Sequence, residues 1–186
     1  IGTFGRSEAG KATWQAQEYY NVWSKSIGVK ESIKTLAKYY DVKYNDSPRY
    51  ELLQQYVKDV KSGWVSPLSG FTNYETLHNR VESELVGKQT ANGIQITGQS
   101  KHFIQRIIGT GADPIKTNAA GQPVRRSGVE FEEIADAILN GTARPLKVDA
   151  KTGSRSQKFC NGICEVSINP DTGTLIQCNP KKERST

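Results

Sequence analysis

The aromatic residues of this chain are unevenly distributed, and their distribution constrains the fold more than any other feature. All eight tyrosines and all three tryptophans of the 186 residues lie before residue 75. Apolar residues recur at helical spacing in the same part, as in SPRYELLQQYVKDV (47–60), where Ser47 is expected to cap the helix and Pro48 to occupy its first turn. We therefore predict a mostly architectural, all-helical segment over residues 1–88 and a second segment over residues 89–186.

The second segment is expected to contain a short helix around residues 100–108, a longer helix and several short strands. GVEFEEIADAILNG (128–141) has helical spacing, a candidate cap at Ser127 and a stop signal at Asn140-Gly141. The segment after Lys88 could be a linker, but Ile94 and Ile96 alternate with polar neighbours, which indicates a short strand around them. The glycine- and proline-rich stretch from residue 109 to residue 128 is typical of a long surface loop.

Two turn signals divide the end of the chain into three expected strands. QKFCNGICEVSINPDTGTLIQCNP (157–180) contains Asn161-Gly162 and the sequence NPDTG, each of which favours a hairpin. Pairing residues 164, 166 and 168 with residues 178, 176 and 174 would gather apolar side chains on one face. Glu165, Ser167, Leu175 and Gln177 would then lie on the other face. The predicted fold class is α+β: a helical subdomain followed by a helix packed on an antiparallel sheet.

Charge and motifs exclude several function classes. The chain has 25 Lys and Arg against 19 Asp and Glu, a net charge of +6, which favours contact with a polyanion. Phosphate-loop, dinucleotide-binding, HExxH and GxSxG motifs are absent from the sequence. Two separated histidines and three clustered cysteines do not make a zinc site, so we expect no metal and no cofactor. No apolar run approaches the roughly 20 residues of a membrane span, so none is expected.

The stretch SKHFIQR (100–106) carries the candidate chemistry. His102 and Arg106 are one helical turn apart, so both side chains can face one pocket. Histidine moves protons near neutral pH, and arginine binds phosphate with two parallel donors. Cleavage of RNA through its 2′-hydroxyl needs a base, an acid and a cation, and no metal. The loop that follows ends in Arg125 and Arg126, which are further candidates for substrate binding.

The order of SKHFIQR, the helix GVEFEEIADAILNG and the hairpin CEVSINPDTGTLIQCNP resembles the C-terminal toxin domains of bacterial polymorphic toxins. It is similar to the group whose fold is shared by barnase, colicin D and RelE ribonucleases, over roughly residues 90–180. Residues 1–88 would then resemble the helical pre-toxin region of such proteins. The absence of methionine is expected for a piece excised from a longer polypeptide.

The resemblance implies roles for individual residues. His102 would be the helix-borne histidine and Arg106 the phosphate-binding cation, with Lys101 as a second cation. Family members add a hydroxyl or amide from the sheet, and the residues at that place are Ser167, Thr174 and Gln177. The tyrosine and second histidine of several members are missing, so the proton donor stays open. Either His102 serves both steps, or one of three other residues assists: Glu165, Lys158 or His78.

The resemblance also implies partners and a location. The chain would be a secreted or surface-displayed toxin of interbacterial competition that cuts tRNA or another structured RNA in the cytoplasm of the target cell. An acidic cognate immunity protein would cover His102 and the basic loop. Two alternatives stay open at this point: a nucleic-acid or protein binding module without catalysis, and a toxin that cuts DNA.

Overall fold

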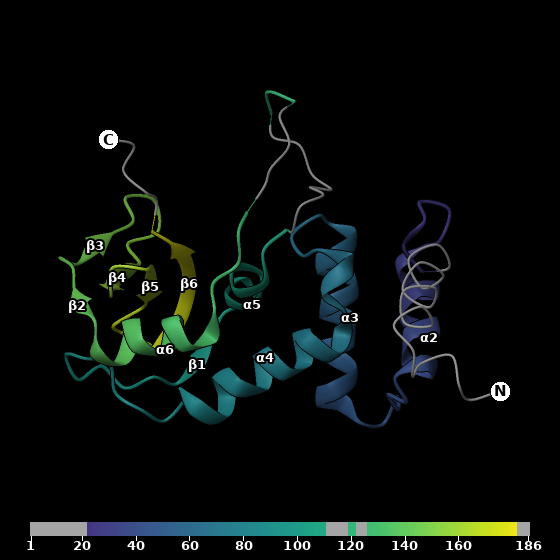
Figure 1. Ribbon diagram of the computed structural model, residues 1–186, viewed down its shortest axis with the longest axis horizontal. Helices are drawn as coiled ribbons and strands as arrows, with labels where there is room; N and C mark the ends of the chain where they lie inside the picture. Colours follow the sequence, from purple (N-terminus) through teal and green to yellow (C-terminus); the bar gives the residue numbers. More distant parts are fainter. Residues whose placement is uncertain (1–21, 111–118, 122–125, 182–186) are drawn as a thin grey trace.

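The computed structural model describes residues 22–110, 119–121 and 126–181 of the chain. The helices are α2 (Val29–Tyr39), α3 (Ser47–Lys61), the 3-10 helix η1 (Pro67–Ser69), α4 (Phe71–Glu84), α5 (Lys101–Ile108) and α6 (Phe131–Asn140). The strands are β1 (Gly98–Gln99), β2 (Thr142–Ala143), β3 (Lys147–Val148), β4 (Arg155–Cys160), β5 (Cys164–Ile168) and β6 (Thr174–Pro180). Helices precede the sheet and also pack on it (Figure 1), so the predicted α+β class is confirmed. Within the described residues, no helix has the length and apolar character needed to cross a membrane.

Helix α3 is close to its predicted position, but its N-terminus differs in detail. Asp46 occupies the N-cap position and Ser47 is already helical, so the prediction that Ser47 caps the helix is wrong. The Ser47 hydroxyl instead lies 3.4 Å from a carboxylate oxygen of Glu51, one turn along. Pro48 lies in the first turn as predicted, where its missing N–H group costs no hydrogen bond.

Aromatic side chains form the core between α3 and α4, as predicted. Tyr56, Phe71 and Tyr74 are all fully buried. The ring centroid of Tyr56 lies 5.7 Å from that of Phe71 and 5.2 Å from that of Tyr74. Rings at these separations pack with favourable tilted geometry and exclude water. These three aromatic side chains are therefore structural.

The sheet has six strands, and its order is β1-β6-β5-β4-β2, with β3 also pairing with β4. The two predicted hairpins, β4–β5 and β5–β6, are present. The Asn161 side chain accepts bonds from the backbone N–H groups of Ile163 and Cys164, and Asn169 does the same for Asp171, so both turns are built by asparagine. The pairing of β1 with β6 is parallel, so the sheet is mixed and not purely antiparallel as predicted.

The predicted register of the second hairpin is wrong. Val166 pairs with Cys178 and Ile168 pairs with Leu175, with an irregularity between Ser167 and Ile168. Two residues of β6 therefore oppose one residue of β5, which is the geometry of a β-bulge. The bulge turns Leu175 into the buried apolar face, whereas a regular strand would have placed it on the other face.

The expected strand around Ile94 and Ile96 is also absent from the described chain. The segment forms only an isolated bridge between Gln89 and Gln95. Ile96 is nevertheless fully buried, so its apolar character serves the core without a strand. The short strand β1 follows it and continues directly into α5.

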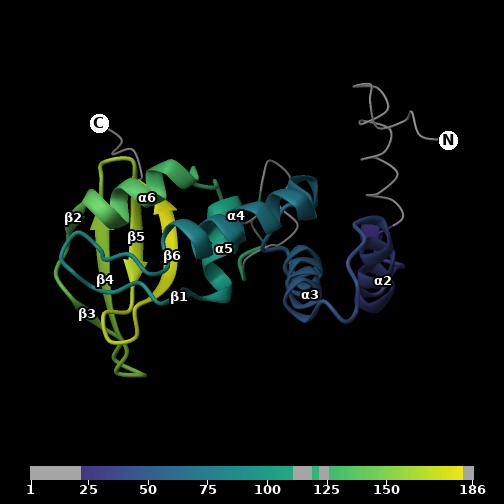
Figure 2. The ribbon, with the colours of Figure 1, turned by 90° about the horizontal axis from the view of Figure 1, so that it is seen from below.

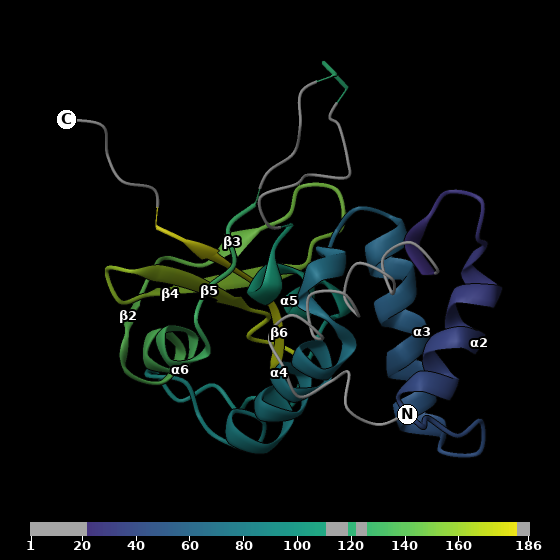
Figure 3. The ribbon, with the colours of Figure 1, turned by 45° about the vertical axis from the view of Figure 1, so that its right-hand side comes forward.

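Helices α5 and α6 cover different parts of the sheet. Figure 2 shows α6 running across one face of β4, β5 and β6, and the Cys164 thiol of that face bonds the Glu133 carbonyl of α6 at 3.3 Å. Glu130, and not Ser127 as predicted, is the N-cap residue of α6. Helix α5 packs beside β6, and Figures 1 and 3 both show it between the sheet and α3.

The two segments defined by composition share one hydrophobic core, which runs from Val22 to Cys178. Contacts across residue 88 join them at several points. The backbone N–H of Ser66 bonds the carbonyl oxygen of Gly109 at 3.2 Å. Arg80 of α4 lies over the ring of Phe131 at the start of α6, with its guanidinium carbon 4.0 Å from the ring centroid. The boundary between residues 88 and 89 itself stays a prediction.

Candidate functional site

Helix α5 places its first turn at the junction between the sheet and the helical segment. The Ser100 hydroxyl donates to the Ile176 carbonyl at 2.7 Å, and the Ser100 N–H donates to the Leu175 carbonyl at 2.8 Å, so the start of the helix is fixed to β6. Lys101 and His102 follow and are exposed, while the next residues on the inner side are buried. Two chemically useful side chains are thus held at the surface by a rigid backbone.

The side chains of Gln105 and Asp59 orient His102 through a chain of hydrogen bonds. Nδ1 of His102 lies 3.0 Å from Oε1 of Gln105, and Nε2 of Gln105 donates to Oδ1 of Asp59 at 2.8 Å. The bond to Asp59 fixes which end of the amide faces the histidine. Because a carbonyl oxygen only accepts, Nδ1 must carry the proton, and Nε2 of the neutral ring keeps a free lone pair. This is the arrangement of a base held in one tautomer by a third group.

Asp59 is a buried carboxylate at the centre of this network. It is 7% exposed, and its second oxygen accepts a bond of 2.7 Å from the Tyr74 hydroxyl, which itself accepts a bond from Gln55. Burial raises the pKa of Asp59, while the hydrogen bonds from Tyr74 and Gln105 and the charge of His102 oppose that rise. Burial and the neighbouring Asp59 charge raise the pKa of Tyr74 as well.

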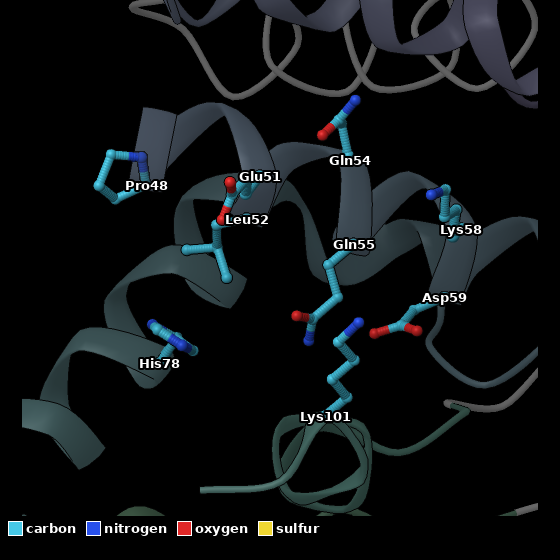
Figure 4. Close-up of a pocket in the computed structure, with 9 residues that line it drawn as sticks. All are labelled: Pro48, Glu51, Leu52, Gln54, Gln55, Lys58, Asp59, His78 and Lys101. Atoms are coloured by element: carbon cyan, nitrogen blue, oxygen red, sulfur yellow. The ribbon is translucent and has the colours of Figure 1, made fainter. Parts of the chain in front are cut away.

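A cavity of about 510 Å³ opens beside this network, between α3, α4 and the start of α5. Figure 4 shows Gln55 and Lys101 extending into it from opposite sides, with His78 on α4 facing the same space. The nine lining residues come from both segments: Pro48, Glu51, Leu52, Gln54, Gln55, Lys58, Asp59, His78 and Lys101. Two lysines, one imidazole, two carboxylates and two amides therefore surround a volume within the usual range for ligand pockets.

The structure places Arg106 against Trp64. The guanidinium carbon lies 5.7 Å from the centroid of the Trp64 ring, a cation–π distance. Nε of Arg106 is buried and has no hydrogen-bond partner within the described part of the chain. Arg106 lies one helical turn after His102 on α5, as predicted, with its Nε enclosed beside Trp64.

Three of the predicted sheet residues form a row. Lys158, Ser167 and Gln177 pair across β4, β5 and β6, so their side chains share the face opposite α6. Lys158 also forms a 3.5 Å ion pair with Glu165 of that face. Thr174 lies apart from the row, at the start of β6, where it pairs with Gly98. Within residues 22–110 and 126–181, no hydrogen bond or ion pair joins this row to His102.

The predicted basic loop falls mostly outside the described residues, and Arg125 lies there. Arg126 is described: its backbone N–H donates to the Thr110 hydroxyl at 2.8 Å. Burial lowers the pKa of the Arg126 guanidinium, and the nearby Cys178 thiol opposes this. Arg126 is thus partly enclosed at the base of the loop, close to the end of α5.

The cysteines of the sheet have a structural setting. Cys160, Cys164 and Cys178 are all buried free thiols. Burial raises the pKa of the Cys164 thiol to about 11, which suppresses its thiolate form. Within the described chain, no group of three or more His, Cys, Asp and Glu side chains could hold a metal ion.

Sequence reasoning missed Asp59, Gln105 and Tyr74, all of which are buried. A signal for Asp59 was present in the helical pattern. It follows Tyr56 by three residues, so an ionisable side chain occupies the apolar side of α3. Buried carboxylates need partners, and such a position is a reason to look for a polar network. Nothing local marks Gln105 in the same way.

No protein family model, curated protein or solved structure matches this chain. The features of the described chain that bear on function are the hydrogen bonds around His102 and the cavity lined by Lys101 and Asp59.

Proposed function

We propose that this protein is a metal-independent endoribonuclease in which His102 transfers the proton. The observation that carries the proposal is the His102–Gln105–Asp59 chain, which leaves Nε2 of an exposed imidazole free to act as a base. Nε2 would remove the proton of an RNA 2′-hydroxyl, whose oxygen would then attack the adjacent phosphorus. The bond to the 5′-oxygen would break and leave a 2′,3′-cyclic phosphate.

Two further requirements of this reaction have candidates nearby. Lys101, which precedes His102 in the first turn of α5, would stabilise the negative charge of the transition state. The guanidinium of Arg106, one helical turn after His102, would add positive charge beside the phosphate. The leaving 5′-oxygen would take a proton from protonated His102 or from His78, which lines the same cavity as Lys101. The row Lys158, Ser167 and Gln177 would hold a more distant part of the RNA.

The biological role that fits this chemistry is that of a secreted antibacterial toxin. Its substrate would be tRNA or another structured RNA in the target-cell cytoplasm, and the net charge of +6 supports binding to such a polyanion. An acidic immunity protein would neutralise it by covering His102 and the basic residues around Arg126. The charge complementarity would speed the association of the two proteins.

The test is expression of the full chain and of His102→Ala in bacteria from a tightly regulated promoter. We expect the wild type to arrest growth and to yield discrete RNA fragments with 2′,3′-cyclic phosphate ends. The purified protein should give the same fragments in vitro when EDTA is present. His102→Ala should lose at least about 100-fold of the cleavage rate, the typical contribution of a positioned acid or base. The control variant Lys147→Ala changes an exposed residue of β3, outside the candidate site, and should cut RNA as the wild type does.

Three outcomes would reject the assignment. Equal cleavage by the wild type and by a folded His102→Ala variant would remove the base. Cleavage of DNA that EDTA abolishes would favour the DNA-cutting toxin. RNA that is bound in a strongly salt-dependent way but never cut would favour the binding module. Thermal melting of each variant separates a loss of function from a loss of fold.

A further inference from the structure

The cavity between α3, α4 and α5 has a chemical lining that suits one part of an RNA strand. Lys58 and Lys101 offer ammonium groups for a phosphate. Pro48 and Leu52 offer an apolar wall, and the His78 imidazole offers a flat face on which a base can stack. Free phosphate would not use the apolar wall, and an apolar ligand would leave the charged groups without partners.

The position of the cavity links it to the reacting group. Lys101 lines the cavity and is adjacent to His102 in the first turn of α5. Asp59 lines it too, and the same carboxylate orients His102 through Gln105. A ligand in the cavity would therefore contact the residue that precedes His102 and the carboxylate that orients it, while His102 itself is not among the lining residues.

The size of the cavity limits what can occupy it. About 510 Å³ matches a pocket for a small molecule or for a single residue of a polymer, whereas a duplex is far larger. Proteins that recognise RNA sequence commonly take up unpaired bases that are splayed out of the strand and stacked on side chains. Gln55 extends into the cavity (Figure 4) and carries one amide group, whose Nε2 donates to Tyr74 and whose oxygen can accept a bond from the edge of such a base.

We infer that this cavity binds one unpaired nucleotide of the RNA substrate, with its phosphate at Lys101 and its base stacked on His78. This inference rests on the proposed function, because it takes RNA as the ligand. It gives the helical segment a direct part in substrate recognition, since His78, Gln55 and Lys58 all belong to α3 or α4.

The test uses a fluorescent single-stranded RNA oligonucleotide with 2′-O-methyl groups, which the enzyme cannot cut. Its binding to the full-length chain is measured by anisotropy over a series of salt concentrations. Lys101→Ala should weaken binding about tenfold, and the slope of log affinity against log salt should become shallower by about 0.7. His78→Ala should also weaken binding about tenfold without changing that slope. Lys147→Ala should bind as the wild type does, apart from a small effect on the slope.

Wild-type affinity in both cavity variants would overturn the inference, and so would equal competition by a duplex of the same sequence. These results are separable from the test of catalysis. If the wild type cuts RNA through His102 and the cavity variants bind the oligonucleotide as well as the wild type does, the cavity inference fails and the proposed function stands. If the wild type cuts no RNA but binding depends on Lys101 and His78, the proposed function fails and the nucleotide site stands.

Discussion

Asp59→Asn removes a buried negative charge while keeping the size of the side chain, and it tests the network that orients His102. Burial raises the folded-state pKa of Asp59 above that of an unfolded chain, which is about 3.9. Between these two pKa values the folded protein binds more protons than the unfolded protein does. The free energy of unfolding must therefore fall as the pH rises through this interval.

The size of the effect follows from a single proton. One group that differs fully in protonation between the folded and unfolded states changes the free energy of unfolding by about 1.4 kcal/mol per pH unit. Asparagine resembles the neutral carboxyl group and does not titrate. Relative to Asp59→Asn, the wild type should thus lose stability with a slope approaching that value, starting near pH 4 and ending at the folded-state pKa of Asp59.

Urea unfolding of both proteins from about pH 4 to pH 8 measures this difference. Asp149→Asn is a matched control of opposite sign, because backbone N–H groups of Thr152 and Lys151 lower the pKa of the exposed Asp149. Relative to the wild type, that variant should lose stability as the pH rises from the folded-state pKa of Asp149 to about 3.9, and the difference should stay constant from about pH 4 to pH 8. If the free energies of unfolding of the wild type and Asp59→Asn change in parallel with pH, burial does not raise the pKa of Asp59.

Two other predictions follow from single residues. Gly173→Ala should destabilise the protein by about 1–3 kcal/mol more than Gly153→Ala in thermal or urea unfolding: both glycines have positive φ angles of 76° and 72°, but only at Gly173 would a Cβ atom meet Gln95 and its neighbours. Gln105→Leu should lower kcat by up to about 100-fold with little change in KM, because it releases His102 and Gln105 itself does not line the cavity; an unchanged kcat would show that the His102–Gln105–Asp59 chain has no role.

Local signals in the sequence predicted much of the sheet. The turns at Asn161 and Asn169 depend on side chains that bond their own backbone within three residues, so a short window of sequence contains the cause. The register of β5 on β6 could not be predicted in the same way. It depends on the bulge beside Ser167, which is favoured by the packing of Leu175 and not by a local preference.

The candidate site was only partly visible in the sequence for a similar reason. The helix that carries His102 and Arg106 followed from local periodicity, and both residues do lie on it. The partner that orients His102 is Asp59, which bonds a residue 46 positions away. The parallel pairing of β1 with β6 also joins distant residues, Gly98 and Thr174. Contacts of this kind depend on the complete fold, which no pattern within one segment contains.

The change of composition near residue 88 therefore does not divide the candidate site. The first segment provides the carboxylate that orients the imidazole and most of the cavity wall, and the second provides the imidazole and Lys101. A carboxylate at Asp59 is costly to bury, and Gln105 of the other segment supplies one of the donors that compensate this cost, beside the Tyr74 hydroxyl. The Gln105–Asp59 hydrogen bond therefore both holds the two segments together and turns the Gln105 oxygen toward His102. The two segments must pack against each other for His102 to keep its proton on Nδ1 and leave Nε2 free to act as a base.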